Sequence, residues 1–71
     1  MLSIEQIVTY LEREIAEKHL AGERQELLHI QYAAGLLMKA AQDAGDNETA
    51  RRFRVLAARA ADHREELSGG A

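Results

Sequence analysis

The stretch from Leu27 to Ala41 is apolar on nearly every side when it is projected as a helix. It carries two apolar stripes that lie roughly opposite each other. The first stripe comprises Leu27, Ile30, Ala34, Leu37, Met38 and Ala41, and the second comprises Leu28, Tyr32, Gly35 and Leu36. An ordinary surface helix has one apolar stripe, so a helix with two is expected to be covered on both sides. In a chain of 71 residues the cover must come from two neighbouring helices or from a second molecule.

The residues before this stretch predict a first helix over about 4–21. Its apolar face repeats at helical spacing through Ile4, Ile7, Val8, Leu11 and Ile15. Ser3 followed by Gln6 is the pattern of an N-terminal capping box. Gly22 ends the helix, because glycine is favoured just past a helix end. A helix that continues or kinks through Gly22 is the alternative, since Glu23 and Arg24 are helix formers and not caps.

The remaining residues predict two more helices, over about 24–44 and 47–67. Gly45 ends the second helix, and Asp46 or Asn47 caps the third. Residues 68–71 are expected to fray. The predicted fold is therefore all-α: one domain over residues 1–71, a three-helix unit whose second and third helices form an antiparallel hairpin. A chain this short buries a small core, so we expect the unit to assemble into an oligomeric helical bundle.

Composition narrows the possible functions. Cysteine is absent, which excludes disulfides, thiolate metal sites and a thiol nucleophile. The formal net charge of −3 argues against a general affinity for nucleic acid or for an anionic membrane. The apolar stretch 27–41 is too short to span a bilayer. A cytoplasmic location is expected, because the chain lacks both cysteine and a signal-peptide pattern at its start.

The three histidines suggest a metal site at one end of the bundle. Reversals at Gly22 and Gly45 would bring together His19, Glu26, His29, His63 and Glu66. The spacing of Glu26 and His29 is that of carboxylate-bridged di-iron bundles, and His63 and Glu66 repeat it in reverse. Imidazole and carboxylate suit iron or zinc as the cofactor. The interpretation that we favour is simpler: these are boundary histidines with an apolar ring and one solvent-exposed nitrogen, and no cofactor is expected. The metal site and a pH-sensitive interface are the alternatives.

The third helix is rich in arginine, but its arginines do not form a single stripe. They are Arg51, Arg52, Arg54, Arg59 and Arg64, with acidic residues interleaved. No aromatic side chain is available beside them to stack on bases. A solvated face, or one that docks on an acidic partner such as the Glu-rich first helix, is favoured over a nucleic-acid surface. Glu48 and Arg52 are expected to pair at i, i+4 spacing.

No catalytic set is visible, since the only serines are Ser3 at a helix cap and Ser68 in the tail. The sequence favours a small non-enzymatic protein–protein interaction module: an adaptor, a regulator or an assembly subunit. Its partner-binding residues would be Leu28, Tyr32 and Leu36, and its partner a second copy in a homodimer, another protein, or both. One alternative is an oligomeric, ferritin-like metal-binding protein that uses Glu26, His29, His63 and Glu66. A nucleic-acid-associated regulator is the other.

Overall fold

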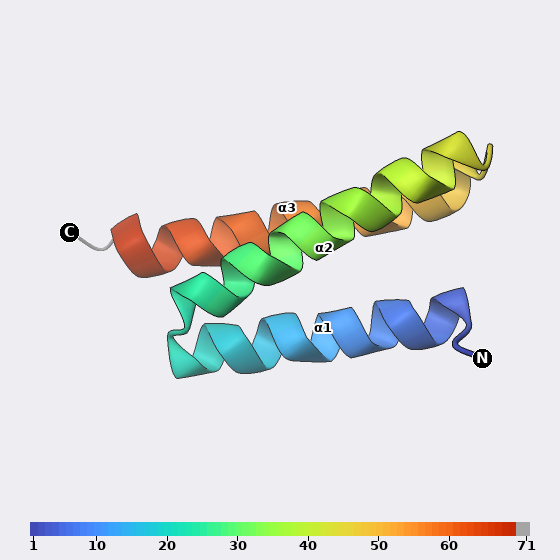
Figure 1. The fold of residues 1–71 in the computed structure, drawn as a ribbon. Coiled ribbons are helices and arrows are strands. Elements are labelled where there is room, and N and C mark those ends of the chain that lie inside the picture. The colour runs from blue at the N-terminus through green and yellow to red at the C-terminus, as the bar shows by residue number, and fades with distance from the viewer. Residues whose placement is uncertain (70–71) are drawn as a thin grey trace.

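Three α-helices make up almost all of residues 1–69, the part of the chain that the computed structural model describes (Figure 1). They are α1 (Ile4–Ala21), α2 (Arg24–Asp43) and α3 (Asn47–Gly69). No strand occurs within these 69 residues, so the all-helical prediction is confirmed. None of the three helices is long and apolar enough to cross a membrane.

The start of α1 is fixed by a reciprocal pair of hydrogen bonds. The Gln6 backbone N–H donates to Ser3 Oγ at 3.1 Å, and the Ser3 backbone N–H donates to Gln6 Oε1 at 2.9 Å. These bonds satisfy two of the amide groups that a helix N-terminus leaves without partners. The predicted capping box is confirmed.

The chain leaves α1 at Gly22, which adopts the left-handed conformation with φ of 71°. The Gly22 N–H donates to the His19 carbonyl, and the Glu23 N–H donates to the Lys18 carbonyl at 2.9 Å. This arrangement closes a helix C-terminus, and glycine adopts it without steric cost. The helix therefore stops before Gly22 instead of running through it. Glu23 precedes α2 at the N-cap position and makes no side-chain cap hydrogen bond, as its sequence indicates.

The second connection places Gly45 in the left-handed region, with φ of 79°. Of the two candidate caps for α3, the structure uses Asp46. Its carboxylate accepts hydrogen bonds from the Thr49 backbone N–H at 3.1 Å and from the Thr49 hydroxyl at 2.7 Å. Both bonds favour the ionised carboxylate and lower the pKa of Asp46.

The two connections lie at opposite ends of the molecule (Figure 1). α2 and α3 lie side by side and share the largest interface, whereas α1 packs less extensively against each of them. Ile15 and Leu27 are the most deeply buried large side chains, each at most 1% exposed. The other buried apolar residues of the core are Val8, Leu11, Ala34, Ala41, Ala50, Phe53, Leu56 and Ala60.

Only one of the two apolar stripes of α2 is buried within this three-helix unit. Leu27, Ala34 and Ala41 of the first stripe face the core. Tyr32 and Leu36 of the second stripe are exposed. The expectation that both sides of this helix are covered is therefore not met within one chain.

The end of α3 differs from its prediction. Ser68 and Gly69 are helical, although the sequence analysis assigns them to a frayed tail. The Ser68 hydroxyl donates to the Arg64 and Glu65 carbonyls, both at 3.2 Å, and this local bonding accompanies the last turn. Gly70 and Ala71, the rest of that predicted tail, lie outside the described residues.

Candidate interaction face and histidine cluster

The second stripe of α2 presents large apolar side chains to solvent. Tyr32 is 66% exposed and Leu36 is 70% exposed, while Leu28 is half-buried. Their i, i+4, i+8 spacing places all three on one side of the helix. The structure thus leaves the predicted partner-binding residues at the surface, with Leu28 the least accessible of them.

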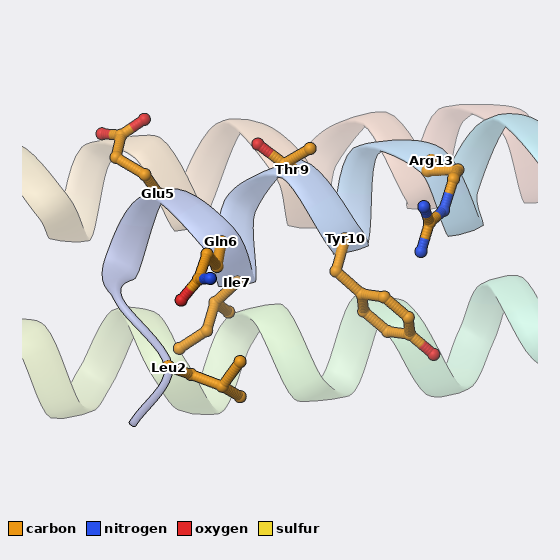
Figure 2. Close-up of a pocket in the computed structure, with 7 residues that line it drawn as sticks. All are labelled: Leu2, Glu5, Gln6, Ile7, Thr9, Tyr10 and Arg13. Carbon is orange, nitrogen blue, oxygen red and sulfur yellow. The ribbon is translucent and has the colours of Figure 1, made fainter.

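A groove in the first half of α1 adds to this apolar surface. Its volume is about 650 Å³, and Leu2, Ile7 and Tyr10 are its apolar lining. Figure 2 shows these three side chains projecting on the side of α1 that faces α2, whereas Glu5 and Thr9 project on the other side. Leu2 is 71% exposed and Tyr10 is 53% exposed.

A second hollow of about 350 Å³ lies between α1 and α2 and shares Tyr10 with the first. Ile30 and Ala33 of α2 line it, and its rim carries Glu14, Lys18, Glu26 and His29. Tyr10 lines both hollows, and we call the two together the α1/α2 groove. Sequence reasoning did not assign Tyr10 to a binding surface, since Tyr10 lies off the regular apolar face of its helix.

A cluster of two histidines and one glutamate lies between the last turn of α1 and the C-terminal part of α3. The His19 and His63 rings stack with centroids 3.8 Å apart and planes inclined by 11°. Glu66 Oε1 lies 3.3 Å from His19 Nε2, and Glu66 Oε2 lies 3.5 Å from His63 Nδ1. The second contact lacks hydrogen-bond geometry, so His63 Nδ1 is buried without a hydrogen-bond partner.

The four metal ligands expected from the sequence do not all meet. His63 and Glu66 come together, and His19 joins them. Glu26 and His29 form a separate pair on α2, with Glu26 Oε2 and His29 Nδ1 2.8 Å apart. This pair is largely exposed and borders the α1/α2 groove, because the side of α2 that carries it faces α1.

Two of the five arginines of α3, Arg52 and Arg64, are half-buried within the three-helix unit. Arg52 makes two hydrogen bonds to the Glu5 carboxylate on α1, and not the expected pair with Glu48. These bonds lower the pKa of Glu5 and raise the pKa of Arg52. Arg64 is half-buried, and its Nε atom has no hydrogen-bond partner.

No known protein family matches this sequence, and no curated protein or solved structure matches it either. The exposed apolar face and the histidine cluster are therefore the features of the chain that bear on its function.

Proposed function

We propose that this chain is a small, non-enzymatic protein–protein interaction module that acts in the cytoplasm as an adaptor, a regulator or an assembly subunit. Its binding face would combine the α1/α2 groove with the stripe formed by Leu28, Tyr32 and Leu36. The observation that carries the proposal is the exposure of Leu2, Tyr10, Tyr32 and Leu36, each more than half accessible. Contiguous exposed apolar residues with a polar rim are typical of protein-binding surfaces.

The groove and the stripe adjoin each other on α2. Ala33 lines the groove, and Leu36 lies one helical turn farther along the same helix. Residues three positions apart are neighbours on a helix surface. A partner seated in the groove would lie next to Leu36, and one that extended over Leu36 would also reach Tyr32, one turn back. Tyrosine is common among the residues that dominate binding energy.

The accessible surface of the chain supports the same proposal. A folded monomer of 7.9 kDa is expected to expose about 4,400 Å². This chain exposes 4891 Å² and measures 41 × 21 × 15 Å. The elongated shape and the open groove leave more surface accessible to water than a compact monomer would. A partner that covered the groove would bury part of this additional surface.

We propose a second copy of the chain as the partner, with a helix of one protomer packed in the groove of the other. The antiparallel α2/α3 hairpin would serve as the scaffold of the resulting bundle. The groove rim carries both acidic and basic side chains: Glu5, Arg13, Glu14, Lys18 and Glu26. In a two-fold symmetric dimer, a rim of mixed sign can place acids opposite bases and so avoids like-charge repulsion.

Light scattering across a wide concentration series tests this proposal. We expect the molar mass to rise from one chain towards two, and Leu36→Glu to weaken association by roughly tenfold or more. Ala58→Glu is the matched control, because Ala58 is exposed on α3 and does not line the groove. A monomeric mass at every concentration, or equal effects of the two substitutions, would contradict self-association through this face.

A further inference from the structure

Three side chains with metal-binding chemistry converge where α1 and α3 meet at their C-terminal ends. His19 belongs to the last turn of α1, and His63 and Glu66 lie one turn apart on α3. One potential ligand atom from each residue lies within 4.8 Å of the other two. Two imidazole nitrogens and one carboxylate oxygen form a ligand set that zinc accepts, with a water molecule in the fourth position.

The distances in this cluster are close to those of a zinc site. With bonds of about 2.0–2.1 Å, neighbouring ligand atoms of a tetrahedral zinc lie roughly 3.3 Å apart. His19 Nε2 and Glu66 Oε1 are separated by 3.3 Å, and His63 Nδ1 and Glu66 Oε2 by 3.5 Å. The two separations end on different oxygens of the Glu66 carboxylate, so a carboxylate that binds through one oxygen keeps one of them nearly unchanged. The other ligand atoms lie within 4.8 Å of one another and must move closer.

The stacked rings define the movement that metal binding requires. The planes of His19 and His63 are inclined by only 11°, and an imidazole lone pair lies in the plane of its ring. Two parallel rings do not aim at one point, so one of them must turn. The His19 side chain is 31% exposed and sits near the helix end, which leaves it room to rotate.

A second observation, independent of the spacing, also indicates a ligand. His63 Nδ1 is buried and has no hydrogen-bond partner. Buried polar atoms are nearly always paired in native proteins, so an orphaned nitrogen requires an explanation. A bond from this nitrogen to a metal ion would satisfy it, and the 61% exposed side chain of Glu66 leaves an approach from solvent.

We propose that His19, His63 and Glu66 together bind one Zn²⁺ ion. All three ligands come from a single chain, so the site does not depend on the homodimer proposed above. The ion would join the end of α1 to α3, the two helices whose mutual interface is small. Because a metal that binds only the folded state stabilises it by mass action, zinc should raise the unfolding temperature.

Zinc titration of the chelator-treated, full-length chain tests the site, with a competing chromogenic chelator as the readout. We expect one equivalent of Zn²⁺ to bind, and His63→Gln and Glu66→Gln to weaken its affinity by roughly tenfold or more. His29→Gln is the matched control, because His29 also pairs with a glutamate one turn away but lies outside the cluster. Mg²⁺, which prefers an oxygen-only octahedral shell, should not compete.

A site-resolved measurement keeps the proposal testable if His63→Gln destabilises the fold. Imidazole NMR signals of the unsubstituted chain should shift for His19 and His63 on zinc addition and stay in place for His29. Glu66 is exposed, so Glu66→Gln should remain folded by circular dichroism while losing zinc. Binding well below one equivalent, or an equal loss of affinity in His29→Gln, would overturn the proposal.

Discussion

The guanidinium of Arg52 in α3 binds the carboxylate of Glu5 in the first turn of α1 through two parallel hydrogen bonds. The Nη2–Oε2 bond measures 3.1 Å, and Nη1 donates to the other carboxylate oxygen. A two-point bond of this kind fixes orientation more strictly than a single contact. It connects the acidic first helix to the basic third helix within one chain.

Glu5→Gln should lower the unfolding temperature slightly at neutral pH and have no effect in acid. The pKa of Glu5 is lowered from 4.5 in the folded chain, mainly by its bond to Arg52. The stabilisation is therefore fully present above pH 4.5 and is lost as the pH falls through the lowered folded-state pKa. Because the pair is exposed, we expect a decrease of no more than roughly 3 °C in a thermal melt.

The control for this pair is Glu17→Gln, which removes a negative charge from an exposed position of α1 away from Arg52. Added salt should shrink the effect of Glu5→Gln, since it screens exposed charges. If the difference in unfolding temperature between the original chain and Glu5→Gln persisted unchanged in acid, the Glu5–Arg52 pair would not be its cause.

Asp46→Ala should destabilise the chain through loss of the α3 cap. Both hydrogen bonds from Thr49 would disappear, and with them the acceptor for one amide of the first turn. We expect the unfolding temperature to fall by roughly 4 °C or more. The pKa of Asp46 is lowered from 3.8, so its contribution should be present above pH 3.8 and be lost as the pH falls through the lowered value.

Asp46→Asn separates the hydrogen bonds of this cap from its charge. Asparagine retains an acceptor for the Thr49 N–H. The unfolding temperature of Asp46→Asn should therefore fall less at neutral pH than that of Asp46→Ala. The part of the stability that is lost in acid through Asp46 should be absent from Asp46→Asn, because an amide does not titrate. Equal melting temperatures for the alanine and asparagine variants would argue that the cap contributes through charge alone.

Leu27 and Leu28 offer a matched pair of adjacent leucines with opposite surroundings. Leu27 is fully buried, so Leu27→Ala should cost about 3 kcal/mol in urea unfolding. That is a large share of the roughly 4–10 kcal/mol expected for a chain of this length. Leu28 is half-buried, and Leu28→Ala should cost about 1 kcal/mol. Similar losses would show that the two stripes of α2 are equally buried in solution.

Two glycines should respond to alanine in opposite directions. Gly22→Ala should destabilise by about 1 kcal/mol, because its φ of 71° is strained for a residue with a Cβ atom. Gly35 lies inside α2, and a Cβ atom there meets nothing within 4 Å. Gly35→Ala should therefore stabilise by about 0.5–1 kcal/mol, since alanine favours the helix. Chemical denaturation would measure both, and a stabilising Gly22→Ala would contradict the left-handed cap.

All helix limits except the end of α3 could be predicted closely from the sequence, because local chemistry sets them. Ser3 with Gln6, and Gly45 with Asp46, act within a few residues of the boundary they define. Periodicity also found the buried stripe of α2. It could not decide whether the stripe with Tyr32 and Leu36 would be covered, because that depends on how α1 and α3 are placed around α2.

The candidate sites were only partly accessible for the same reason. Counting residues on either side of each turn predicts which side chains lie at the same end of the bundle. This counting indicated His63 and Glu66 as candidate ligands. It could not place His29, because the rotation of α2 about its own axis directs that side chain towards α1. The i, i+4 spacing likewise predicted Glu48 as the partner of Arg52. That spacing cannot identify a partner on another helix, such as Glu5.

The unequal packing of α1 has a consequence for the order in which the chain folds. α2 and α3 are joined by a short turn and share most of the interhelical surface, so their pairing closes a small loop. The polar contacts of α1 to α3 at its two ends, through Glu5 and His19, join residues far apart in sequence and must close much larger loops. Docking of α1 is then a late folding step and its release an early unfolding step. Native-state hydrogen exchange should report the amides of α1 opening before those of α2 and α3.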